Sequence, residues 1–127
     1  MDATPALKRP RVMLGNLGPM ARVGMRRLLN EDGIEVVDDA LTSGMSPEVE
    51  RLQPDVVVLD LDQTESQELT ELVRLACPRA KVVLWAATED VMEVIDPGAS
   101  RPRLVVSGVP EDLLAEMSIQ RELRVEE

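Results

Sequence analysis

Residues Pro54–Asp62 read PDVVVLDLD, and this stretch decides the fold. Its uninterrupted apolar run, residues 56–59, is typical of a strand buried on both faces of a parallel sheet, because a strand with one face in water alternates apolar and polar side chains. Parallel strands need a crossover between them, which is usually helical. The stretch therefore predicts an α/β protein.

The segments on either side alternate between β-rich runs and helical patterns. Further strands are expected at residues 11–15, 34–37, 81–85 and 104–106. Helices are expected at residues 19–33, 46–52 and 64–78, and from residue 110 onward, with a stunted helix at 89–95. Residues 1–10 are expected to form a flexible arm and residues 11–127 one domain: a three-layer (βα)5 sandwich around a five-stranded parallel sheet.

Composition excludes several classes of function. The chain has 127 residues, about one domain, with 14 Lys and Arg against 24 Asp and Glu, so its net charge is −10. That charge repels a phosphate backbone, and with Trp85 as the only aromatic residue the chain lacks platforms on which bases could stack. There is no histidine to act as a base or metal ligand. We expect no direct binding of nucleic acid by this domain.

The single cysteine, Cys77, excludes an internal disulfide and a cysteine-based zinc site, and we expect a buried, inert thiol. No apolar run approaches the roughly 20 residues of a membrane-spanning helix, and the first thirty residues lack the apolar core of a signal peptide. The sequence therefore predicts a cytoplasmic protein without membrane contacts.

Packing expectations concern three sets of side chains. Four methionines are expected to fill gaps in the core: Met20, Met25, Met92 and Met117. The last helix is expected to turn Leu113, Leu114 and Met117 inward and to keep Glu116 in water. Thr64 and Gln67 form a capping-box pattern at the start of the third helix.

Ligands of open α/β sheets collect at the carboxyl ends of the strands, so the residues that follow each strand carry the functional argument. Those residues are Asn16 and Leu17, Asp60 and Asp62, Ala86, and Ser107. Asp60 stands at the tip of the buried strand, where its carboxylate is held rigidly.

Four stretches carry a resemblance to a known family. They are RVMLGNLGPMARVGMRRLL (11–29), PDVVVLDLD (54–62), PGAS (97–100) and VPEDLL (109–114), and they resemble the receiver domain of two-component response regulators, chiefly those with a helix-turn-helix output. The resemblance implies a flavodoxin-like fold with strand order 2-1-3-4-5, here with a shortened fourth helix.

The resemblance also implies roles for the strand-end residues. Asp60 stands where the family has its phosphoryl-accepting aspartate, whereas Asn16 and Leu17 replace its two acidic magnesium ligands. Ala86 replaces its hydroxyl residue and Ser107 its lysine. Since Mg²⁺ prefers anionic oxygen ligands, we expect a degenerate pocket that holds no metal.

The function expected is therefore that of a pseudo-receiver. It is a non-enzymatic signalling module without a cofactor, which acts through phosphorylation-independent protein contacts in bacterial signal transduction or transcription control. It stands alone or belongs to a longer regulator. Two alternatives stay open: a response regulator still phosphorylated on Asp60, and a haloacid-dehalogenase-like phosphotransferase, because residues 56–64 also fit that family's D-x-D-x-T motif with Asp60 and Asp62.

The partner expected is a protein, and a homodimer is one candidate. Residues 1–30 hold six basic side chains against one acidic, whereas the last helix is acidic. The basic first helix is therefore expected to face the acidic last helix, either within the chain or across a symmetric dimer. The interface candidates are Met20, Arg22, Arg26, Arg27, Leu114, Met117 and Ile119.

Overall fold

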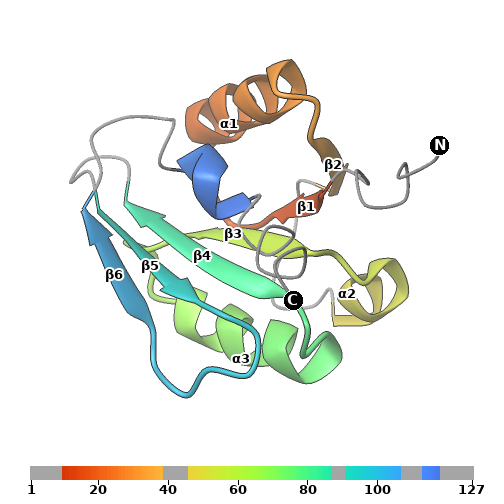
Figure 1. The fold of residues 1–127 in the computed structure, drawn as a ribbon, viewed down its shortest axis with the longest axis vertical. Coiled ribbons are helices and arrows are strands. Elements are labelled where there is room, and N and C mark those ends of the chain that lie inside the picture. Colours follow the sequence, from red (N-terminus) through yellow and green to blue (C-terminus); the bar gives the residue numbers. More distant parts are fainter. Residues whose placement is uncertain (1–9, 39–45, 87–90, 107–112, 118–127) are drawn as a thin grey trace, which may run out of the picture.

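The computed structural model describes residues 10–38, 46–86, 91–106 and 113–117. Among them, six strands form one mixed sheet in the order β2-β1-β3-β4-β5-β6 (Figure 1). The strands are β1 (Arg11–Leu14), β2 (Glu35–Asp38), β3 (Val56–Asp60), β4 (Lys81–Ala86), β5 (Val91–Ile95) and β6 (Arg103–Val106). The helices are α1 (Pro19–Glu31), α2 (Ser46–Leu52) and α3 (Ser66–Ala76), and residues 113–117 are also helical.

The first four strands confirm the expected parallel arrangement. β1 pairs in parallel with β2 and β3, and β3 pairs in parallel with β4. Every residue of β3 from Val56 to Leu59 is fully buried, which agrees with the unbroken apolar run. The α/β class and the strand order 2-1-3-4 are as predicted.

The rest of the sheet differs from the prediction. The segment expected as a stunted fourth helix is strand β5, which pairs antiparallel with β4 and with β6. Met92 and Val94 point into one core cluster while Glu93 lies between them, half-buried, so the segment follows the period of a strand. Three of its five residues, Val91, Val94 and Ile95, are β-branched and favour the extended conformation. The expected fifth strand is β6, one place farther out than predicted.

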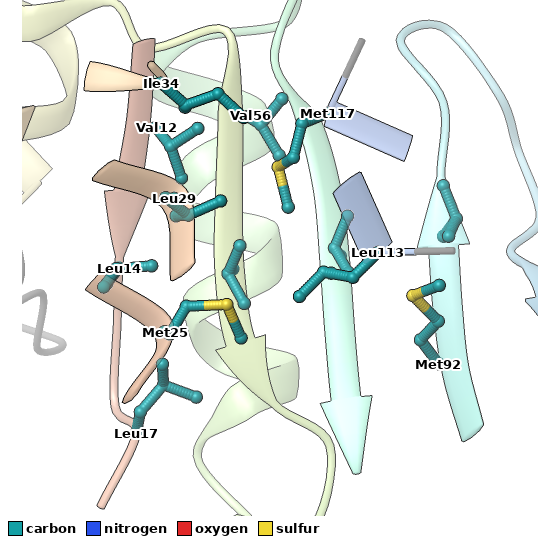
Figure 2. Close-up of a cluster of buried hydrophobic side chains, with 13 residues drawn as sticks. Val12, Leu14, Leu17, Met25, Leu29, Ile34, Val56, Met92, Leu113 and Met117 are labelled. Atoms are coloured by element: carbon teal, nitrogen blue, oxygen red, sulfur yellow. The ribbon is translucent and has the colours of Figure 1, made fainter. Parts of the chain in front are cut away.

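Two hydrophobic clusters fill the spaces on either side of the sheet. On one side, Met25 and Leu29 of α1 and the apolar residues of 113–117 cover the sheet; on the other side, Val49 of α2 and Leu69 of α3 do so. Figure 2 shows Leu113 and Met117 directed toward the sheet residues of the first cluster. The parallel half is thus the predicted three-layer sandwich.

Several side chains correct the packing expectations. Met25, Met92 and Met117 are buried as predicted, but Met20 is 89% exposed because it lies on the outer side of α1. Glu116, expected in water, is buried. The capping box of Thr64 and Gln67 is absent, since α3 begins at Ser66 with Glu65 as its N-cap residue and without a capping side-chain hydrogen bond.

Candidate functional site

The carboxyl ends of the parallel strands bring together most of the residues that the sequence singled out. Asp60 ends β3, Ala86 ends β4, and Asn16 follows β1 by two residues. Asp60 and Asn16 are half-buried, and Asp62 is exposed. Ser107 lies outside the described residues.

Asn16 connects three segments at this edge. Its amide oxygen accepts a hydrogen bond from the backbone N–H of Asp60 at 3.1 Å, and its amide nitrogen donates to the hydroxyl of Ser66 at 3.0 Å. The Ser66 hydroxyl in turn donates to the backbone carbonyl of Asp60. The end of β1, the end of β3 and the first turn of α3 are therefore held by one side chain, where the resemblance places a metal ligand.

The Asp60 carboxylate is engaged locally. One of its oxygens accepts a hydrogen bond from the backbone N–H of Asp62 at 2.9 Å, the pattern by which aspartate stabilises a turn two residues on. Its own backbone N–H and C=O bind Asn16 and Ser66, as described above. The carboxylate thus shapes the loop after β3.

Two of the other strand-end side chains belong to the core. Leu17 is 5% exposed and packs in the cluster beneath α1, and Ala86 is fully buried. Trp85, next to Ala86, is half-buried and packs against the same cluster as Leu17. Leu17 and Ala86 have no side-chain oxygen or nitrogen atom that could bind a ligand. Within the described ranges, no group of three or more His, Cys, Asp or Glu residues is placed to hold a metal ion.

The hydrogen bonds predict unequal effects of two substitutions at this edge. Asn16→Ala should lower the free energy of unfolding by about 1–3 kcal/mol, because the Asp60 N–H loses its acceptor and the Ser66 hydroxyl loses the hydrogen bond that Asn16 donates to it. Asp60→Ala should cost about 0.5–1.5 kcal/mol, because its carboxylate accepts one exposed hydrogen bond. Urea denaturation of the two variants measures both values. A larger loss in Asp60→Ala than in Asn16→Ala would contradict this assignment.

A second polar cluster lies near the start of β4, at the end of the strand opposite to Ala86. The sequence analysis did not predict it. Lys81 opens β4 and is only 1% exposed; its ammonium group donates to the backbone carbonyl of Glu116 at 2.7 Å and to the Glu116 carboxylate at 3.2 Å. Arg103 of β6 donates to the same carboxylate at 2.9 Å and to both oxygens of Asp96. We call Lys81, Asp96, Arg103 and Glu116 the ion cluster.

The ion cluster perturbs the pKa of each of its members. Burial lowers the pKa of Lys81 in spite of the nearby Glu116 carboxylate. Burial also opposes the ionisation of Glu116, but the hydrogen bond from Arg103 and the charge of Lys81 outweigh it, so the pKa of Glu116 lies below its ordinary value. The hydrogen bond from Arg103 lowers the pKa of Asp96, and the two carboxylates raise the pKa of Arg103. The cluster holds two positive and two negative charges.

A sequence signal for the ion cluster existed. Lys81 begins the otherwise apolar strand KVVLW, and Glu116 and Met117 follow Leu113 by three and four residues, the spacing that places residues on one face of a helix. A charged residue on an apolar face is rarely buried without a partner. The positions of Lys81 and Glu116 therefore each indicated a buried partner of opposite charge, although neither pattern identified the partner residue.

The interface candidates divide into exposed and buried residues. Arg26 and Arg27 of α1 are exposed, as is Met20, and Arg27 forms an exposed ion pair with Glu31 at 3.4 Å. Arg22 and Leu114 are half-buried, and Met117 is 1% exposed within the chain's own core. Ile119 lies outside the described residues. Met117 therefore has no free surface to offer a second copy.

No helix in the described part of the chain is long and apolar enough to cross a membrane. Cys77 is buried and free, and burial raises the pKa of its thiol, as expected for an inert residue. Comparisons of the chain with protein-family models, with curated proteins and with solved structures gave no match.

Proposed function

We propose that this chain is a receiver-like signalling module that does not catalyse a reaction and acts through protein contacts independent of phosphorylation. The proposal rests on the four stretches that resemble receiver domains. It agrees with the parallel β2-β1-β3-β4 half of the sheet, covered by helices on both faces. A process of bacterial signal transduction or transcription control in the cytoplasm fits that resemblance.

The observation that carries the proposal is the use made of the strand-end side chains. The side-chain amide of Asn16 is hydrogen-bonded to the Asp60 N–H and to the Ser66 hydroxyl, while Leu17 and Ala86 are packed in the core. Phosphoryl transfer is accelerated by cations and hydrogen-bond donors directed at the phosphoryl oxygens. Asp60 lacks such helpers at the positions of Asn16, Leu17 and Ala86, so this edge serves as a scaffold.

The contact surface that best suits a protein partner is the outer side of α1. Met20 and Val23 are exposed there, beside the basic side chains of Arg26 and Arg27. An apolar centre with a charged rim is the usual composition of a protein interface. A second copy that presents the helix containing Leu114 is one candidate for this surface; another protein with an acidic face is the other.

Treatment with acetyl phosphate and Mg²⁺, followed by intact-mass measurement, tests the proposal. We expect an unchanged mass, because the edge around Asp60 lacks the groups that stabilise the transition state. Stoichiometric addition of one phosphoryl group, abolished in the matched variant Asp60→Asn, would instead establish a phosphorylated response regulator.

The same samples address the haloacid-dehalogenase-like alternative. That chemistry needs Asp60 as nucleophile and Asp62 as acid and base, so p-nitrophenyl phosphate would be hydrolysed by the unmodified chain and not by Asp60→Asn or Asp62→Asn. We expect no hydrolysis above the buffer rate. Turnover that both substitutions remove would replace the proposed function with an enzymatic one.

A further inference from the structure

The outermost strand of the sheet, β6, exposes apolar side chains. Among the described strands it pairs with β5 alone, so one of its edges carries main-chain N–H and C=O groups without a strand partner. Leu104 is 65% exposed and Val106 is 76% exposed. An edge strand of this kind is a template for pairing with another strand.

The register of the sheet shows which face these side chains occupy. Leu104 lies opposite Glu93, which lies opposite Leu84, a residue of the cluster beneath α3. Because residues directly opposite each other in antiparallel strands share a face, Leu104 and Val106 lie on the α3 side. Val105 points to the other side and packs against the cluster that contains Met92.

Edge strands are usually protected from pairing by charged side chains and prolines, and here these residues precede Leu104. Pro102 precedes β6, and the guanidinium of Arg103 is bound to Asp96 and Glu116. Residues 104–106 contain neither a charge nor a proline. The partner that best complements this edge is a strand that is also apolar over three residues, because opposite apolar side chains then cover each other.

We propose that a second copy of this chain occupies this edge, with the two β6 strands antiparallel and a two-fold axis at Val105. β6 itself is such a strand. In this register Leu104 faces the Val106 of the second copy on the α3 side, and Val105 faces its own equivalent on the other side. A two-fold axis perpendicular to the sheet makes the α3 side of one copy continuous with the α3 side of the other. Even-numbered residues of β6 therefore face even-numbered residues of the second copy, and odd-numbered residues face odd-numbered ones.

Charge placement is compatible with this pairing. The two Arg103 side chains lie at opposite ends of the paired strands, about 14 Å apart along the strand direction at ~3.4 Å per residue. Each is already bound to carboxylates of its own chain. The net charge of −10 on each copy opposes association at long range, so added salt should strengthen the dimer by screening that repulsion.

The size of the interface sets its strength. Stable dimers bury about 20–30 residues a side, far more than one short strand supplies. The dimer is therefore weak and reversible, and is visible only at high protein concentration. The proposal does not depend on the receiver resemblance, because it uses the sheet edge alone.

Sedimentation velocity of the full chain, from about 10 μM to about 1 mM, tests the assembly. We expect the weight-average mass to rise toward twice that of the monomer with concentration, and to rise further with added NaCl. The double variant Leu104→Lys/Val106→Lys should stay monomeric throughout. The matched control is Leu75→Lys, at an exposed apolar position of α3, which should dimerise as the unmodified chain does. The variant Met20→Lys/Val23→Lys, the α1 control, tests the α1 surface of the proposed function separately.

Three outcomes of this experiment would overturn the proposal. They are a monomer at every concentration, a dimer that persists with lysines in β6, and a dimer abolished by the α1 control. The last outcome would instead favour the α1 surface of the proposed function, so the two proposals fail separately. Thermal melting of each variant shows whether the fold is retained.

Cysteine cross-linking tests the register. Residues facing each other in antiparallel strands have Cβ atoms about 4.5–5.5 Å apart, close to the spacing of a disulfide. Val105→Cys should therefore form a covalent dimer under mild oxidation, whereas Leu104→Cys, which faces residue 106, should form severalfold less. Cys77 is buried and does not compete. Equal yields from the two variants would overturn the axis at Val105.

Discussion

Lys81→Ala is expected to lower the free energy of unfolding by about 3–5 kcal/mol, the usual cost of removing one partner from a buried ion pair. The Lys81 ammonium group donates to the backbone carbonyl of Glu116 at 2.7 Å and to the Glu116 carboxylate at 3.2 Å. Without it, both acceptors stay buried with Arg103 as the remaining cation. The shortened side chain also leaves a cavity at a fully buried position.

A double-mutant cycle separates the charge from the cavity. Lys81→Met keeps most of the side-chain volume, and in the background of Glu116→Gln its effect should be at least about 1 kcal/mol smaller than in the unmodified chain, because the two residues interact. The matched control is Arg51→Met, which breaks the exposed pair with Glu48 and should change stability by less than about 1 kcal/mol. Urea denaturation provides all of these values, and strict additivity of Lys81→Met and Glu116→Gln would contradict the ion cluster.

Gly15→Ala is expected to cost about 1–3 kcal/mol through overpacking. Gly15 follows β1, where its N–H donates to the carbonyl of Val58 at 2.8 Å, and a Cβ atom there would lie 2.2 Å from a methyl carbon of Leu59. Leu59 is fully buried, so its side chain can move aside only by disturbing the cluster beneath α3. The close approach of the chain to β3 at this point requires glycine.

Two comparisons test this explanation. Leu59→Ala alone should cost about 2–5 kcal/mol, and the double variant with Gly15→Ala should cost less than the sum, since the new methyl group enters the space that Leu59 leaves. Gly24→Ala in α1 is the control: a Cβ there would meet no described atom within 4 Å, so this change should stabilise the helix by about 0.5–1 kcal/mol. Equal losses in Gly15→Ala and Gly24→Ala, measured by thermal melting, would contradict the steric cause.

The sequence predicted the parallel half of the fold well because its signals there are local. The signals are the apolar run at residues 56–59, the proline at the start of α1, and Pro47 and Pro54, which lie in the first turn of α2 and just after its end. Each acts within or next to one element. Segment 91–95 was predicted wrongly, because a run this short suits both a helix turn and a strand until its neighbours are known. The strand conformation of this segment depends on its pairing with β4 and β6, which the local sequence does not reveal.

The predicted topology placed the strand-end residues together at the carboxyl ends of the parallel strands, and Asn16, Asp60 and Ala86 lie there in the structure. Their hydrogen bonds could not be read from the sequence: Asn16 was expected near Asp60, but its partners are the Asp60 backbone and Ser66. The ion cluster escaped prediction for the same reason, since Lys81 and Glu116 lie 35 positions apart. Neither residue reveals its partner alone.

The register of β3 and β4 separates the two polar groups of the sheet. Lys81 lies opposite Val56, and Asp60 lies opposite Trp85, so the ion cluster and the Asp60 carboxylate stand at opposite ends of the same pair of strands. Four residue steps at ~3.3 Å place them about 13 Å apart along the strands, farther than the ~7–10 Å beyond which substitutions without shared partners usually have additive effects. A substitution at Asp60 and one at Lys81 should therefore change the free energy of unfolding independently, so that each end of the sheet can be altered without disturbing the other.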